Sequence, residues 1–195
     1  MSRGPSTIDI KCNCGKFQAR AEIDPKVGNH LVCTCNSCQK YMHKLGRDDL
    51  LDHHGGTTLF QMAPQKVTFV SGTEDLKCMK LSPNGLLRWY AGCCKTPIAN
   101  TVKQAKMPFV GIPTIAFGFK DGKAGASTLG PVRESVWGLH AKNGRPDGSR
   151  DKASFGFMMR SMRLLLRAMI VHRGEPSPFF DNSGNPICEP ELAPR

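Results

Sequence analysis

The cysteines constrain this chain more than any other feature of its sequence. Nine of its 195 residues are cysteines, and seven of the nine fall into three short groups. The groups are the pair Cys12 and Cys14, the triplet Cys33, Cys35 and Cys38, and the adjacent pair Cys93 and Cys94. An odd total gathered in this way fits a disulfide framework poorly, and it favours metal binding or thiol chemistry in a reducing compartment.

The beginning of the chain and its hydropathy lead us to expect a cytoplasmic protein. The segment MSRGPSTIDIKCNCG lacks the apolar core of a signal peptide, and no stretch approaches the ~18 consecutive apolar residues of a membrane span. We therefore expect no membrane partner. Lys and Arg number 27 against 16 Asp and Glu, and the resulting net charge of +11 favours anionic partners without choosing among them.

The first half of the chain has the pattern of antiparallel β structure, because short apolar runs alternate with turn residues. In KFQARAEI the residues Phe17, Ala19, Ala21 and Ile23 recur with a period of two, which predicts a strand with one buried face. We expect further strands in TTLFQM, VTFVSG, KCMKL and LLRWY, and a short strand-like run in TIAFGF. The sequence thus predicts a mainly β protein.

One α-helix is expected near the C-terminal end, at about residues 152–172, where length, composition and stop signals agree. Arg160, Arg163 and Arg167 lie on one face of this helix by their spacing. We expect the helix to pack on the sheet and to leave these arginines in solvent. The alternative is a helix that binds an anionic partner or a membrane surface.

Cys12 and Cys14, together with the pair Cys93 and Cys94, are candidates for one metal site. Gly15 allows the tight turn that brings the two thiolates of a C-x-C to one ion. If the strands return Cys93 and Cys94 to the same place, the group can close a tetrahedral zinc site worth on the order of 10 kcal/mol to folding. Alternatively, one of Cys93 and Cys94 is a small buried hydrophobe.

The triplet in LVCTCNSCQK is a separate candidate, because Cys33, Cys35 and Cys38 supply three thiolates from one loop. A zinc site with three protein ligands keeps a fourth position for water or substrate. A closed structural site is the alternative if a fourth ligand comes from Cys78, His43, His53 or His54. A thiol redox pair is disfavoured, because we do not expect Cys35 and Cys38 at the start of a helix within a βαβ unit.

In their order along the chain, CNCGKFQ, CTCNSCQK and CCKTPIAN resemble the motifs of the glutathione-dependent formaldehyde-activating enzymes and their centromere protein V relatives. The resemblance covers about residues 8–101 and implies the β-tent fold, in which antiparallel sheets bind zinc. We therefore expect a zinc-binding β domain at 8–101 and an extension at 102–195 that packs on it and contains the predicted helix.

The resemblance also implies roles for individual cysteines. It implies a structural zinc at Cys12, Cys14 and Cys94, and a second zinc that acts in catalysis at Cys33, Cys35 and Cys38. The last family motif reads C-x-x-C-G-T-P, whereas this chain has Ala91 in place of its first cysteine and Lys95 in place of its glycine. We expect Cys93 to be the substitute ligand.

The resemblance implies an enzyme, a carbon–sulfur lyase that acts on adducts of aldehydes such as formaldehyde with glutathione or another thiol. Three thiolates make zinc a poor Lewis acid, but the ion would keep a bound glutathione sulfur deprotonated and nucleophilic. His43 is the best candidate for a residue that transfers protons.

The alternative function is a non-catalytic zinc module that binds an anionic polymer or a protein. Nucleic acid is possible but not favoured, because the cysteine spacing matches no helix-bearing zinc finger and the chain has only two Trp and two Tyr for stacking.

Overall fold

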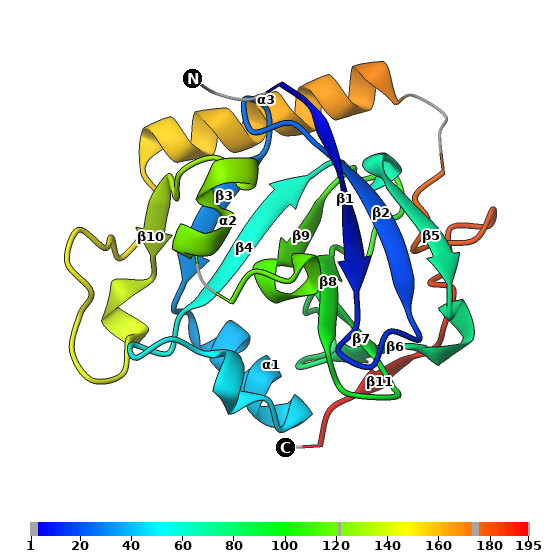
Figure 1. The fold of residues 1–195 in the computed structure, drawn as a ribbon, viewed down its shortest axis with the longest axis horizontal. Helices are drawn as coiled ribbons and strands as arrows, with labels where there is room; N and C mark the ends of the chain where they lie inside the picture. The colour runs from blue at the N-terminus through cyan, green and yellow to red at the C-terminus, as the bar shows by residue number, and fades with distance from the viewer. Residues whose placement is uncertain (1–3, 121, 173–175, 195) are drawn as a thin grey trace.

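The computed structural model describes residues 4–120, 122–172 and 176–194. Its smaller sheet has three strands in the order β1-β2-β5. These are β1 (Ser6–Lys11), β2 (Gln18–Ile23) and β5 (Val67–Ser71), paired antiparallel. The protein is mainly β, as predicted (Figure 1).

The larger sheet has eight strands in the order β10-β3-β4-β9-β8-β7-β6-β11. They are β3 (Asn29–Cys33), β4 (Thr57–Met62), β6 (Leu76–Lys80), β7 (Leu87–Ala91), β8 (Pro97–Thr101), β9 (Val110–Pro113), β10 (Glu134–Val136) and β11 (Pro190–Leu192). The six inner strands are antiparallel neighbours, whereas the edge strands β10 and β11 pair parallel with β3 and β6. The edge strands come from the second half of the chain, so that half completes the sheet.

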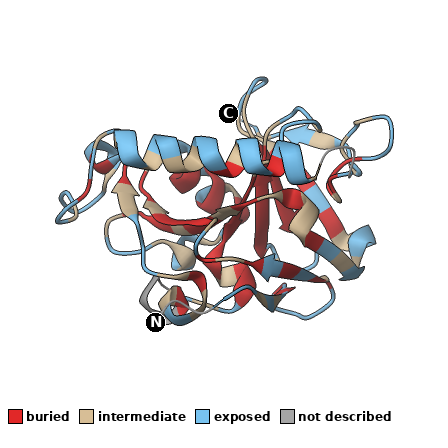
Figure 2. Ribbon diagram, turned by 90° about the horizontal axis from the view of Figure 1, so that it is seen from above, coloured by how far each residue is buried: buried red, intermediate tan, exposed pale blue. Residues whose placement is uncertain are grey.

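The described part of the chain contains three α-helices. They are α1 (Asn36–Leu45), α2 (Gly122–Leu129) and α3 (Phe155–Val171). Short 3-10 turns lie at η1 (Asp48–Leu50), η2 (Pro64–Lys66), η3 (Thr73–Asp75), η4 (Thr114–Phe117) and η5 (Gly138–His140). The α3 helix confirms the predicted C-terminal helix and lies along the outside of the molecule (Figure 2).

The main core lies where the small sheet meets the large one. All four residues of the predicted period, Phe17, Ala19, Ala21 and Ile23, are buried and belong to this core. They share it with side chains of the large sheet such as Trp89, whose ring centroid lies 5.2 Å from that of Phe179. Burial of such aromatic side chains is the main favourable contribution to folding of this layer.

The two parts that we expected at 8–101 and 102–195 share one sheet. Strand β9, from the second part, lies between β4 and β8 of the first. Because β9 pairs with β4 and β8 on its two sides, the large sheet has no break at residue 101. The first part therefore has its full set of strand contacts only when the second part is folded on it.

The strand-like run TIAFGF forms no strand, and two helices, α1 and α2, were not predicted. In TIAFGF the residues Thr114–Phe117 form the 3-10 turn η4, which follows Pro113 and ends at Gly118 with a left-handed φ of 82°. Helix α1 was missed, although its buried Cys38, Tyr41, Met42 and Leu45 have helical spacing. The same segment contains the cysteines from which we predicted a metal-binding loop.

The arginines of α3 do not share one environment. Exposed Arg163 and Arg167 behave as predicted, but Arg160 is half-buried. Its Nη2 donates hydrogen bonds to the backbone carbonyls of Pro25 (3.2 Å), Lys26 (2.7 Å) and Gly28 (3.0 Å). The expectation of a solvated side chain is therefore wrong for Arg160, which joins α3 to the loop before β3.

The outward side of α3 is apolar. Exposed large side chains recur along it at helical spacing, namely Phe155, Met158, Met159, Met162, Leu166, Met169 and Ile170. The inward side buries Leu164 and Ala168. A contiguous apolar surface of this kind is uncommon on a soluble monomer. Within the described residues, no helix combines the length and apolarity needed to cross a membrane.

We predict that Arg160→Met lowers the free energy of unfolding by about 1–3 kcal/mol, because three backbone carbonyls lose a charged donor. The matched variant Arg163→Met removes an exposed guanidinium from the same helix and should change stability by less than about 0.5 kcal/mol. Urea unfolding followed by circular dichroism measures both. Equal losses in the two variants would show that the contacts of Arg160 do not hold α3.

Candidate metal centres

Two segments far apart in the sequence meet at a first group of thiols, the four-cysteine site, formed by Cys12, Cys14, Cys93 and Cys94. Cys12 and Cys14 follow β1, and the other two lie in the turn between β7 and β8. The Sγ–Sγ distances are 3.5 Å for Cys12–Cys14, 3.8 Å for Cys12–Cys93, 3.3 Å for Cys14–Cys93 and 3.8 Å for Cys93–Cys94. All four sulfur atoms lie within 4.8 Å of one another.

These separations fit a tetrahedral zinc ion. Zinc–sulfur bonds of about 2.3 Å at tetrahedral angles place neighbouring sulfurs about 3.8 Å apart. The four cysteines are free thiols. The structure therefore brings Cys93 and Cys94 together with Cys12 and Cys14. Cys93 is close enough to the other sulfurs to replace the cysteine that is missing from the last motif.

Backbone and side-chain contacts hold the two turns of this site together. The backbone N–H of Asn13 donates to Thr96 Oγ1 at 2.9 Å, and the Cys94 Sγ lies 3.1 Å from the same hydroxyl. Lys95 adopts a left-handed φ of 56° where the related motif has glycine, and its Nζ lies 5.2 Å from the centroid of the Tyr90 ring. The cation–π contact offsets part of the strain of this conformation.

The same contacts prepare one thiol for ionisation. Burial raises the pKa of Cys94, but hydrogen bonds from the Thr96 side chain and from the backbone outweigh it and bring the pKa to about 6. A thiolate at this position is therefore favoured at neutral pH, which is the protonation state that a metal ion requires.

We predict that Cys14→Ser removes one zinc ion per chain and lowers the unfolding midpoint strongly, because a structural zinc contributes on the order of 10 kcal/mol. The matched variant Cys188→Ser changes a half-buried cysteine outside both groups and should keep the full zinc content. Metal analysis of the purified proteins and thermal unfolding measure the two effects. The prediction fails if both variants bind the same amount of zinc.

The second group of thiols, the three-cysteine site, comprises Cys33, Cys35 and Cys38, whose sulfur atoms also lie within 4.8 Å of one another. Cys33 ends β3, Cys35 is the N-cap residue of α1, and Cys38 lies in the first helical turn. The Cys38 backbone N–H donates to Cys35 Sγ at 3.4 Å, so the cap itself orients a ligand atom. Cys33 and Cys38 are buried and Cys35 is half-buried.

The contacts among the three thiols of this group favour ionisation of one of them. Hydrogen bonds from the Cys33 and Cys38 side chains lower the pKa of Cys35 and outweigh the opposing effect of burial. The corresponding contacts, together with burial, raise the pKa of Cys33. The group thus concentrates negative charge on its most exposed sulfur, where a cation would bind.

The second half of the chain forms one wall of the three-cysteine site. Val136 belongs to the same buried cluster, and Ala153 and Phe157 pack against it. The Thr34 hydroxyl donates to the carbonyls of Val136 (3.0 Å) and Trp137 (2.7 Å). Thr34, which lies between two of the ligands, is therefore held by the segment that we had expected to be an extension packed on the first part.

The other predicted ligands lie elsewhere. His43 is exposed on α1 with Nδ1 3.1 Å from Asp48 Oδ2, and His54 Nδ1 lies 2.8 Å from the Gly144 carbonyl oxygen. Cys78 instead lies beside Cys188. Among the described residues, no histidine joins either group of thiols, and no fourth Cys, His, Asp or Glu joins the triplet.

One ground for disfavouring a redox pair is wrong. Cys35 and Cys38 do lie at the start of a helix that follows a strand. The strands on either side of α1, however, are β3 and β4, and they pair antiparallel. The segment is therefore not a βαβ unit of the kind in which redox C-x-x-C motifs act.

Sequence reasoning missed Arg88, a buried residue of β7 that lies beside the triplet. Its Nη1 lies 3.9 Å from Cys38 Sγ, and its Nη2 donates to Ser37 Oγ at 2.7 Å. The signal was present in LLRWYA, where one charged residue interrupts an apolar strand. A charged residue at such a position is rarely buried without a partner.

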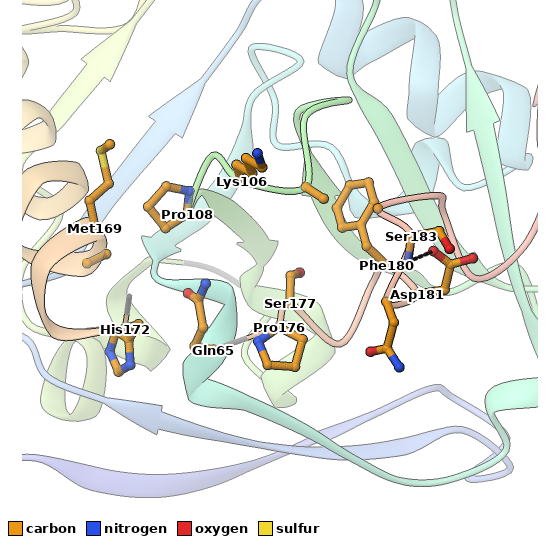
Figure 3. Close-up of a pocket in the computed structure, with 14 residues that line it drawn as sticks. Gln65, Lys106, Pro108, Met169, His172, Pro176, Ser177, Phe180, Asp181 and Ser183 are labelled. Atoms are coloured by element: carbon orange, nitrogen blue, oxygen red, sulfur yellow. Dashed lines mark hydrogen bonds between the residues drawn. The ribbon is translucent and has the colours of Figure 1, made fainter. Parts of the chain in front are cut away.

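A surface hollow of about 720 Å³ lies at the C-terminal end of α3, and no cysteine is among the residues that line it (Figure 3). It is lined by Met169, Pro108 and residues of the loop 176–184. The carboxylate of Asp181 accepts backbone hydrogen bonds from Ser183 and Asn185, at 2.9 Å and 2.8 Å, and so serves the fold of that loop. Lys106 and His172 also line the hollow.

Comparison with known proteins gives one family. The family model that matches residues 5–191 carries the description "Family of unknown function (DUF6151)". No curated protein matches the chain. A crystal structure of a Rhodobacter sphaeroides protein, a target of Northeast Structural Genomics, is similar with 14% sequence identity and a TM-score of 0.41, over 56% of this chain and 86% of that one.

Proposed function

We propose, for a chain that belongs to the DUF6151 family of unknown function, that it is a zinc protein with one structural and one reactive metal site. The proposed reaction is that of a carbon–sulfur lyase, which forms or breaks the bond between a thiol such as glutathione and an aldehyde such as formaldehyde. The resemblance of the cysteine motifs to the glutathione-dependent formaldehyde-activating enzymes suggests this chemistry.

The contrast between the two groups of thiols carries the proposal. The first group has four sulfur atoms, which complete a tetrahedron, whereas the second has three. Zinc sites with four protein ligands are structural, and sites with three keep a position for water or substrate. Two sites of different completeness in one chain therefore support a division between folding and chemistry.

When bound at the three-cysteine site, zinc would keep a substrate thiolate deprotonated near neutral pH. The chain itself would supply orientation: the N-terminus of α1 fixes two of the sulfurs, and the wall at Val136 excludes water from Cys33. The half-buried Cys35 marks the side from which a small thiol could approach. Excess Lys and Arg would suit the carboxylates of glutathione.

The proposed chemistry balances without an oxidant. In the forward direction the thiolate sulfur adds to the aldehyde carbon, the carbonyl electron pair moves to oxygen, and that oxygen takes a proton. In reverse the hydroxyl loses its proton and the carbon–sulfur bond breaks. His43 Nδ1 contacts Asp48 and the residue is not part of the three-cysteine group, so the proposal assigns the proton to solvent.

A non-catalytic zinc module is the second candidate. It is supported by the burial of two of the three thiols, which restricts access of a substrate, and by the net charge of +11. Such a module would bind an anionic polymer or a protein, and electrostatic binding of nucleic acid would weaken steeply with salt.

We predict two zinc ions per chain in the wild-type protein and one in the double variant Cys33→Ser, Cys35→Ser. The variant should also lose any turnover of the adduct of glutathione with formaldehyde, while its fold remains. Metal analysis and a formaldehyde-release assay measure the two properties. Cys78→Ser is the matched control, because Cys78 is buried in β6 but belongs to neither group.

The two candidate functions give different results with the same proteins. Full turnover in the double variant, or turnover unchanged by a chelator that removes zinc from the three-cysteine site, would exclude the lyase mechanism. If the double variant loses one zinc ion but the wild-type protein shows no turnover, the result would favour the binding module.

A further inference from the structure

We propose that Arg88 is the counter-ion of the three-cysteine site, a positioning residue that balances the negative charge of three thiolates around zinc. The inference rests on the proposed zinc site but not on the lyase reaction. It assigns a role to a residue that none of the cysteine motifs contains.

Burial is the first observation. Arg88, the second residue of the inner strand β7, is 3% exposed. Arginine stays protonated inside proteins, because its pKa exceeds about 12. A positive charge therefore lies in the interior of this domain, and a buried charge is costly unless an opposite charge lies nearby.

The second observation concerns the groups around the guanidinium: among the described residues, no carboxylate is bonded to it. Its hydrogen-bond partners are Ser37 Oγ (2.7 Å) and Asn100 Oδ1 (2.9 Å), and its Cζ lies 5.4 Å from the centroid of the Tyr41 ring. Among the ion pairs of the described residues, none includes Arg88. The hydroxyl and the amide oxygen each accept one hydrogen bond from the guanidinium but carry no charge that balances it.

The third observation is the position of the thiols. Nη1 lies 3.9 Å from Cys38 Sγ, and the other two sulfurs lie within 4.8 Å of that sulfur. Three thiolates and one Zn²⁺ have a net charge of minus one. One guanidinium neutralises that charge, so the site and Arg88 form a buried pair with no net charge.

The same contacts orient the ligands. Ser37 and Cys38 both belong to the first turn of α1, and Asn100 belongs to β8. By bonding to both elements, the guanidinium fixes the helix that carries two of the three cysteines against the sheet. Outer residues that orient metal ligands in this way typically change metal affinity about 10- to 100-fold when they are mutated.

The first test compares Arg88→Gln with Arg88→Lys. Glutamine is neutral but can bond to Ser37 or Asn100, whereas lysine keeps the charge and loses the planar geometry. We expect Arg88→Gln to weaken Co²⁺ binding at the three-cysteine site about 10- to 100-fold, and Arg88→Lys to weaken it less. The sulfur-to-cobalt charge-transfer band reports binding, and the band of each protein's Cys33→Ser, Cys35→Ser version is subtracted so that only the three-cysteine site contributes.

The second test is a thermodynamic cycle on stability. Without the thiols of Cys33 and Cys35 the buried guanidinium loses its counter-charge, so Cys33→Ser, Cys35→Ser should lower the urea midpoint. Adding Arg88→Met to that double variant should raise the midpoint again, although Arg88→Met alone lowers it. If the role of Arg88 is purely structural, the stability losses caused by Arg88→Met and by the double cysteine variant should add when the substitutions are combined.

The outcomes separate this inference from the proposed function. If the three-cysteine site binds no metal in the wild-type sequence, the proposed function fails. If it binds metal but Arg88→Gln keeps wild-type affinity, or if the two sets of stability losses add, the proposal for Arg88 is overturned. The exposed Arg163→Gln is the control for a general loss of positive charge, and it should leave the affinity unchanged.

Discussion

The convergence of cysteine sulfur atoms on two points is the constraint on which the rest of this structure depends. The four-cysteine site joins residues 81 positions apart, from the turn after β1 to the turn after β7. Because β1 belongs to the small sheet and β7 to the large one, this group of thiols links the two sheets at one end of the core. Thiolates held this closely would repel one another without a cation between them, so metal binding at the zinc site that we propose would stabilise the fold.

The two sites are also connected through one strand. Arg88 lies in β7 beside the three-cysteine site, and the same strand continues into the turn that carries Cys93 and Cys94. A shift of this strand changes the distances at both centres. A closed zinc site at this turn would thereby help to hold Arg88, our proposed counter-ion, in place beside the three-cysteine site.

Periodic and local features were predictable from the sequence, whereas features that depend on distant segments were not. The buried face from Phe17 to Ile23 and the helix α3 follow from spacing alone, and the cysteine groups identified the sulfur atoms that the structure gathers. The position of β9 between β4 and β8 has no local signature, since it depends on partners some 50 residues away in one direction. The anchoring of Arg160 likewise requires carbonyls from the loop before β3, and spacing on a helix cannot reveal them.

The residues that cover the three-cysteine site are synthesised long after its cysteines, and this order has a consequence for the nascent chain. Its thiols are complete at Cys38, but the wall that shields them begins at Val136, about 100 residues later. At about 5–20 residues per second, the ribosome needs roughly 5–20 s to synthesise the residues between Cys38 and Val136. Throughout that interval the nascent chain presents three adjacent thiols to the surrounding solution. For the zinc site that we propose, the supply of metal during synthesis would therefore influence whether these sulfurs meet a metal ion or an oxidant first.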